Sequence, residues 1–159
     1  MGNALLSQKF YHQMKNLEQR YPHKGALLLP ALHAAQDELG WLSSDALSEI
    51  GDYLQIPSSQ VKEVASFYSM YSLSPVGKYH LKICTNVACW LRGCNQLVDH
   101  CEKKLRIKLG ETTADKKFTL SEEECLGACA TAPVILLNHD YHENLNISKL
   151  DKLLDGIES

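Results

Sequence analysis

Two pairs of closely spaced cysteines constrain the fold of this chain more than any other feature. Cys84 and Cys89 enclose four residues in CTNVAC, and Cys125 and Cys129 enclose three residues in CLGAC. If the four thiolates share one inorganic site, the fold must bring two distant segments together. Each pair lies at the end of a segment whose sequence predicts a β-strand. The end of a strand fixes the position of the loop that begins there. We therefore expect the two pairs to meet at one edge of a sheet.

The composition is that of a soluble globular protein. Of its 159 residues 45% are hydrophobic and 22% are charged, and the net charge of -3 gives no reason to expect nucleic acid or anionic lipid as a partner. No apolar run approaches the roughly 18 residues of a transmembrane helix, and the start lacks a signal-peptide core. We therefore expect an intracellular protein whose six cysteines serve metal or redox chemistry rather than disulfides.

The first half of the chain predicts a helical bundle. Apolar residues recur at helical spacing in four segments, and Gly40 is placed to cap the second of them. The four expected helices cover about residues 5–20, 25–39, 44–54 and 57–67. Their apolar stripes are typical of a bundle core, and no pattern in this half indicates chemistry.

The character of the sequence changes at LSPVGKY, where Ser74, Pro75 and Gly77 mark a turn. We therefore place a domain boundary there. The expected domains are a helical bundle in residues 1–74 and a second domain in residues 75–159.

The second domain predicts a mixed sheet with helices. Alternating or continuous apolar residues indicate strands, and helical spacing follows Gly93 and Ser148. The expected strands cover residues 78–84, 118–125, 133–137 and 141–145. The order strand–helix–strand–strand–strand–helix is similar to the thioredoxin-like α/β architecture. With the bundle before it, the whole chain is expected to be α+β.

The cysteine spacing favours an iron–sulfur cluster over other thiol chemistry. It is too long for a Cys-x-x-Cys redox pair, and neither pair is the Cys-x2-Cys knuckle of zinc ribbons. Two wider pairs suit a [2Fe–2S] cluster, in which each iron takes two thiolates. Gly93 and Gly127 lie where backbone N–H groups could reach sulfur. On spacing alone, zinc and free redox-active thiols stay open as alternatives.

Longer motifs carry a family resemblance. They are CTNVACWLRG, ECLGACATAPV and LNHDYHENL around the cysteines, with LLPALHAAQDELGWLS and VASFYSMY in the first half. Together they resemble the E-subunit family of respiratory complex I, the NADH–quinone oxidoreductase. The resemblance runs from about residue 26 to residue 145.

This resemblance implies a thioredoxin-like [2Fe–2S] ferredoxin with an N-terminal helical bundle. The family's ligands fall on Cys84, Cys89, Cys125 and Cys129. It also implies a partner subunit that carries NADH, FMN and a [4Fe–4S] cluster. This chain has no Gly-rich phosphate loop after a strand, in keeping with those sites on the partner. The family lies in the cytoplasm, held at the inner face of the membrane through the complex, and the chain alone is expected to catalyse nothing.

Several assemblies share these motifs. The matching subunits of NAD-reducing hydrogenases and NAD-dependent formate dehydrogenases are alternatives within the same chemistry. A zinc-stabilised interaction module and a thiol–disulfide oxidoreductase are alternatives of other classes.

Four further residues near the pairs have more than one interpretation. Cys94 stands where the family more often has a small residue without a thiol, and we expect a small apolar side chain there rather than a fifth ligand. Cys101 lies on the apolar face of its helix and is expected in the core. Trp90 could shield the cluster, fill a pocket on a partner or belong to the core. Pro133 stands where thioredoxin-like folds often have a cis peptide.

Overall fold

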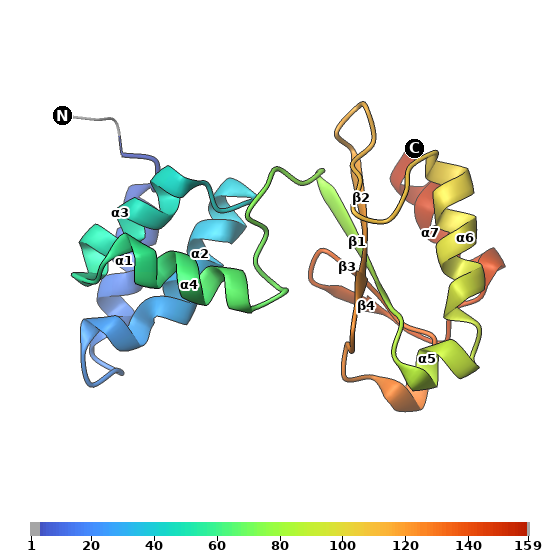
Figure 1. The fold of residues 1–159 in the computed structure, drawn as a ribbon, viewed down its shortest axis with the longest axis horizontal. Helices are drawn as coiled ribbons and strands as arrows, with labels where there is room; N and C mark the ends of the chain where they lie inside the picture. Colours follow the sequence, from blue (N-terminus) through green and yellow to red (C-terminus); the bar gives the residue numbers. More distant parts are fainter. Residues whose placement is uncertain (1–3, 159) are drawn as a thin grey trace. The chain divides into compact units, whose positions relative to one another are not determined.

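A change of packing between Pro75 and Val76 divides the chain into two units, one helical and one built on a sheet. The computed structural model describes residues 4–158. Each unit has a buried apolar core of its own, and Figure 1 shows the elements of both. The predicted α+β fold, with helices before a mixed sheet, is confirmed. Among the described residues, no helix is long and apolar enough to span a membrane.

The first unit contains the four predicted helices; the third has the expected bounds, and the other three are shorter than expected. They are α1 (Gln8–Glu18), a 3-10 turn η1 (Lys24–Leu27), α2 (Leu28–Leu39), α3 (Ser44–Leu54) and α4 (Ser58–Phe67). The hydroxyls of Ser7 and Ser43 accept backbone hydrogen bonds at the starts of α1 and α3. Gly40 ends α2 with φ +82°, a left-handed conformation that favours glycine.

Pro30 explains why the second predicted helix begins late. Proline has no N–H to donate, so it is tolerated in the first turn of an α-helix and not further inside. Starting α2 at Leu28 puts Pro30 in that turn. The preceding residues, Lys24–Leu27, form the 3-10 turn instead.

The second unit holds one mixed sheet within its described residues. Its elements are β1 (Tyr79–Cys84), α5 (Val87–Leu91), α6 (Cys94–Leu105), β2 (Phe118–Glu123), a 3-10 turn η2 (Cys129–Thr131), β3 (Ile135–Leu137), β4 (Asp140–His142) and α7 (Ile147–Glu158). The strand order is β2-β1-β3-β4. Strands β1 and β2 are parallel, whereas β3 pairs antiparallel with both β1 and β4.

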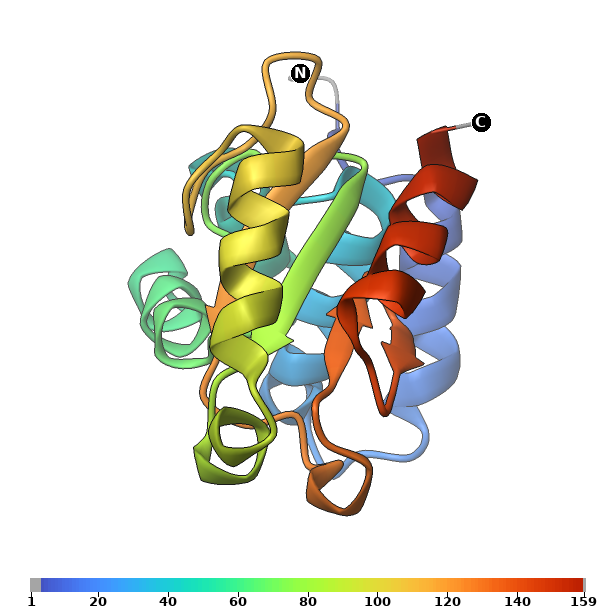
Figure 2. The same cartoon turned by 90° about the vertical axis from the view of Figure 1, so that its right-hand side faces the viewer.

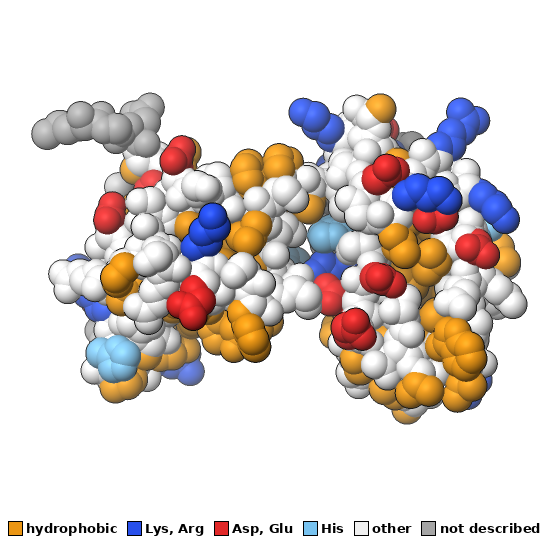
Figure 3. All heavy atoms as spheres, viewed as in Figure 1, with side chains coloured by type: hydrophobic (Ala, Val, Ile, Leu, Met, Phe, Trp, Pro, Cys, Tyr) orange, Lys and Arg blue, Asp and Glu red, His pale blue; other side chains and the backbone are white. Residues whose placement is uncertain are grey.

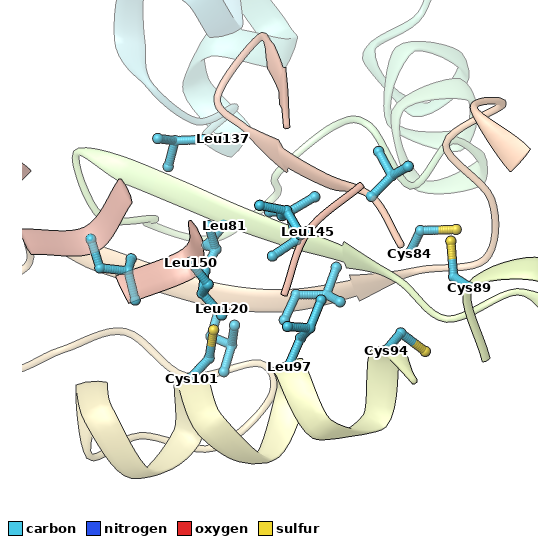
Figure 4. Packing of buried hydrophobic residues seen from close by; sticks show 14 of the residues in the cluster. Leu81, Cys84, Cys89, Cys94, Leu97, Cys101, Leu120, Leu137, Leu145 and Leu150 are labelled. Carbon is cyan, nitrogen blue, oxygen red and sulfur yellow. The ribbon is translucent and has the colours of Figure 1, made fainter. Parts of the chain in front are cut away.

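Helices α6 and α7 cover one face of this sheet, as Figure 2 shows. Leu81 and Leu120 project from neighbouring strands toward Leu97 and Cys101 of α6, and Leu150 of α7 completes the contact (Figure 4). All five side chains are buried, so the predicted core position of Cys101 is confirmed. This packing fixes the sheet edge from which the cysteine segments leave.

Several predicted boundaries in the second unit differ from the structure. Strands β1 and β3 begin at Tyr79 and Ile135 rather than at residues 78 and 133, and β4 covers Asp140–His142 rather than residues 141–145. The strand expected to reach Cys125 ends at Glu123, two residues earlier. The last helix begins before Ser148, because the side chain of Asn146 accepts a hydrogen bond from the Lys149 N–H (2.9 Å). Asparagine is as good a helix cap as serine, and here it lies in the position that reaches the first turn.

The imidazole of His80 on β1 is mostly buried beside β2. Its Nε2 atom lies 2.8 Å from the hydroxyl oxygen of Ser121. The pKa of His80 is lowered to about 4, mainly by burial and also by the positive charge of Lys82, whereas the negative charge of Glu123 raises it. The folded protein therefore holds this imidazole neutral.

We predict that the His80 resonances do not titrate between pH 8 and pH 5.5. The unfolded chain binds a proton near pH 6.5 and the folded chain near pH 4, so stability is lost as the pH falls through that window. This group contributes at most about 1.4 kcal/mol per pH unit. NMR titration of the imidazole checks the pKa, and His80→Gln identifies the resonance. A midpoint above pH 6 would contradict the prediction.

Candidate metal centre

The four predicted ligands lie in three elements and one loop at one end of the second unit. Cys84 is the last residue of β1, and Cys89 lies within α5. Cys125 follows β2, and Cys129 begins η2. Cys84 pairs with Glu123 across the parallel strands, and α5 packs against η2. The fold thus brings the two cysteine segments to the same edge of the sheet.

Cys84 and Cys89 form the inner pair. Each residue is 2% exposed, and Figure 4 shows their sulfur atoms pointing toward one another. The pKa of the Cys89 thiol is raised to about 11, mainly by burial and also by its hydrogen bond with Cys84. A backbone hydrogen bond from Val134 acts in the opposite direction, because it stabilises negative charge on the sulfur.

Cys125 and Cys129 form the outer pair, and both are exposed. Their side chains hydrogen-bond to each other, and this contact is the main cause that raises the pKa of the Cys129 thiol. The N–H of Gly127 donates to the Cys125 sulfur at 3.3 Å. Gly127 has φ +74°, so glycine is what allows the loop to turn its N–H toward the sulfur.

The expectation that Gly127 supplies an N–H to sulfur is therefore confirmed, whereas the matching expectation for Gly93 is wrong. The Gly93 N–H donates to the carbonyl of Trp90 (3.0 Å). Gly93 instead ends α5 and begins α6 with φ +84°, which is a structural use of its conformational freedom.

The four thiols are arranged as two pairs. Each pair is in hydrogen-bond contact internally, and Cys84 is close enough to Cys129 to act on its pKa through charge. A [2Fe–2S] cluster needs two thiolates at each iron. The donor set and its division into pairs fit the binuclear cluster.

Helix α5 was not expected from the sequence, although it carries Cys89. It is five residues long, too short to show a helical period. The amide oxygen of Asn86 accepts a hydrogen bond from the Val87 N–H (2.9 Å) and begins the helix. Asn86 before the helix and Gly93 after it are the signals that could have indicated a helical turn here.

Cys94 lies at the start of α6 and is fully buried. Its sulfur points away from those of Cys84 and Cys89 in Figure 4, and it lies 3.7 Å from the side-chain oxygen of Asn95. Burial raises the pKa of the Cys94 thiol. Burial and a raised pKa are shared with Cys89, so only the direction of its sulfur separates Cys94 from the inner pair, and its expected role as a small apolar side chain stays a prediction.

The loop beside the inner pair contains a cis peptide between Ala132 and Pro133. Its next residue, Val134, contacts both members of that pair. The carbonyl of Val134 accepts a hydrogen bond from the Cys84 N–H (3.1 Å), and its backbone also hydrogen-bonds the Cys89 sulfur. The peptide bond before Pro133, whose isomer the sequence does not determine, is thus cis in the structure.

The sequence of this chain matches one family over nearly its whole length. The family described as thioredoxin-like [2Fe-2S] ferredoxin matches residues 14–158. That range includes all four cysteines of the two pairs.

Relatives that are similar over most of this chain are E subunits of NADH-quinone oxidoreductase. The E subunit of the NADH-quinone oxidoreductase of Rickettsia typhi is 51% identical over 139 residues, which are 86% of this chain and 82% of the relative. The corresponding protein of Rickettsia prowazekii is 44% identical over 98% of this chain and 93% of the relative.

A solved structure shows the same fold in a longer chain. In an NAD+-reducing [NiFe]-hydrogenase in the air-oxidised state, the matching part is 27% identical with a TM-score of 0.74. The match covers 83% of this chain and 23% of the hydrogenase chain. The family match and the relatives together show that this chain belongs to the thioredoxin-like [2Fe-2S] ferredoxin family, among the E subunits of NADH-quinone oxidoreductase.

Proposed function

We propose that this chain is the electron-transferring E subunit of the NADH dehydrogenase module of respiratory complex I. It would hold one [2Fe–2S] cluster through Cys84, Cys89, Cys125 and Cys129. The observation that carries this proposal is the meeting of two contacting thiol pairs at one sheet edge, in a chain of the E-subunit family.

When bound, the cluster supplies one-electron exchange, and the chain's own residues set the conditions for it. The inner pair would bind one iron and the outer pair the other. Hydrogen bonds from Gly127 to Cys125 and from the Val134 backbone to Cys89 stabilise negative charge on those sulfurs. Burial of Cys84 and Cys89 keeps water from the inner side of the site.

The electron partner in this proposal is a subunit that binds NADH, FMN and a [4Fe–4S] cluster. The family relationship supports a multi-subunit assembly, because the relatives are named as subunits of NADH-quinone oxidoreductase. By family resemblance, the cluster of this chain is a side acceptor of the flavin rather than a link toward quinone. The assembly would hold the chain at the cytoplasmic face of the inner membrane.

A second assembly has a specific observation in its favour. The fold of this chain also forms part of an NAD+-reducing hydrogenase, so the equivalent role there, or in a formate dehydrogenase, is the alternative. The identity of the co-purifying subunits separates these assemblies. The higher identity and coverage of the relatives from NADH-quinone oxidoreductase favour complex I.

The central test is spectroscopic. The full chain, purified without oxygen, should be coloured, contain two iron atoms per chain, and give the EPR signal of one [2Fe–2S] cluster after reduction with dithionite. A colourless protein with one zinc ion per chain would favour the zinc-stabilised module. A metal-free protein that forms disulfides reversibly would favour a thiol–disulfide oxidoreductase.

Loss of one outer ligand should remove the cluster. In Cys129→Ala one iron keeps a single protein thiolate, so we predict loss of at least about nine-tenths of the visible absorption and of the EPR signal. Iron analysis of the purified variant measures the loss. Normal iron content with an unchanged EPR spectrum would show that Cys129 is not a ligand.

Cys94→Ser is the matched control, since it removes a neighbouring thiol that points away from the inner pair. We predict iron content and an EPR spectrum equal to those of the unaltered chain. Burying a hydroxyl in place of a thiol should lower stability by about 1 kcal/mol, which thermal unfolding would detect. A changed EPR spectrum would identify Cys94 as a ligand.

A further inference from the structure

A largely buried ion pair lies beside the candidate cluster site. The Nζ atom of Lys82 donates a hydrogen bond to a carboxylate oxygen of Glu123 at 2.8 Å, and the two side chains are 10% and 13% exposed. Lysine and glutamate are rarely buried to this extent unless an opposite charge neutralises them. The pair therefore places two full charges where little water screens them, so each acts strongly on its neighbours.

The register of the sheet puts this ion pair next to a predicted ligand. Glu123 is the residue directly opposite Cys84 on the parallel neighbour. Lys82 precedes Cys84 by two residues on β1, so both side chains project from the same face of the sheet. Neighbouring strands lie about 5 Å apart, which brings the Glu123 carboxylate close to any cluster that Cys84 binds. The Thr85 N–H also donates to the Glu123 carbonyl (3.0 Å), which holds the end of β2 against the first ligand loop.

The charges of the pair act on the neighbouring imidazole of His80. The positive charge of Lys82 lowers the pKa of His80, whereas the negative charge of Glu123 raises it. His80 lies two residues before Lys82 on β1, and Cys84 lies two residues after it. The candidate ligand and the imidazole are thus equally spaced along the strand from the same ammonium. A charge that develops at Cys84 should be influenced by both members of the pair, with opposite signs.

The rest of the surroundings of the inner pair carries less influential charge. Seven consecutive residues, from Thr85 to Leu91, carry no charge. Trp90 in this segment is 57% exposed and is therefore not a core residue, and Figure 3 shows apolar side chains gathered at the end of the second unit where α5 lies. Glu122 and Glu124 are exposed, so water and salt screen their charges. Among these neighbours, the buried ion pair should act most strongly on the site.

We propose that Lys82 sets the reduction potential of the [2Fe–2S] cluster by offsetting the negative charge of Glu123. This inference rests on the proposed function. One-electron reduction adds one negative charge to the site, at iron, with no bond made or broken in the chain. A carboxylate beside Cys84 disfavours that added charge, and an ammonium paired with the carboxylate restores the balance. Lys82 is thus a positioning residue that acts through Glu123 and through its own charge, not as a ligand.

The test uses four variants of the pair and one control. Lys82→Gln removes the positive charge but keeps an N–H donor for Glu123, Glu123→Gln removes the negative charge, the double variant removes both, and Lys82→Arg keeps the charge. The control is Lys108→Gln, which removes the same charge from a pair with Glu102 (2.7 Å) in which Lys108 is 75% exposed. Glu102 lies about 12 Å along α6 from Cys94, at the end nearest the site. Salt screens exposed charges beyond about 10 Å, so this pair should not act on the cluster.

The measurement is the reduction potential of the full, cluster-loaded chain, from a redox titration at pH 7 that follows the EPR signal of the reduced cluster. At this pH His80 beside the pair is neutral and adds no charge. We expect Lys82→Gln to disfavour the reduced state at least about threefold, a fall of about 28 mV at about 59 mV per tenfold change. Glu123→Gln should raise the potential by a similar amount. The double variant should return close to the value of the unaltered chain, and Lys82→Arg and Lys108→Gln should not change it.

Several results would overturn the proposal. Shifts of the same sign in Lys82→Gln and Glu123→Gln would indicate a distorted site rather than an effect of charge, and an equal shift in Lys108→Gln would attribute the effect to net charge. If Lys82→Gln does not retain its cluster, Glu123→Gln decides alone, because a potential that does not rise contradicts the proposal. A normal cluster whose potential is the same in every variant rejects this proposal and leaves the proposed function standing. A chain that holds no cluster rejects the proposed function and this proposal with it.

Discussion

The parallel pairing of β1 with β2 is the constraint on which the candidate site depends. Parallel neighbours end at the same edge of a sheet, so the segments after Cys84 and after Glu123 begin side by side. Such strands cannot be joined by a tight turn, and α6 lies in the long connection between them. Two cysteine pairs about forty residues apart in sequence therefore meet because one helix crosses the sheet between them.

Much of this arrangement could be predicted from the sequence, because it rests on local patterns. Alternation identified β1, helical spacing identified α6 with Cys101 inward, and the glycine in CLGAC indicated an N–H directed at sulfur. The features that could not be predicted depend on contacts between distant segments, which local sequence patterns do not indicate. A five-residue helix shows no period, the end of β2 depends on its partner strand, and the exposure of Trp90 depends on what α5 packs against.

The two thiol pairs differ in a way that spacing alone does not express. The inner pair is enclosed by α5, β1 and the loop at Pro133, whereas the outer pair lies open on the loop between β2 and β3. The backbone supplies hydrogen bonds to sulfur in both pairs, among them one from Val134 in the inner pair and one from Gly127 in the outer pair. Anionic sulfur is thus stabilised by fixed dipoles on both sides, without a nearby cationic side chain among these contacts.

The difference in burial between the pairs has a consequence for how such a protein matures. With Cys84 and Cys89 enclosed, the open route for iron and sulfide into the site passes the outer pair. A partner that covers the outer pair would close that route. Cluster insertion would then have to precede incorporation into the complex, and replacement of a damaged cluster would require the chain to be released first.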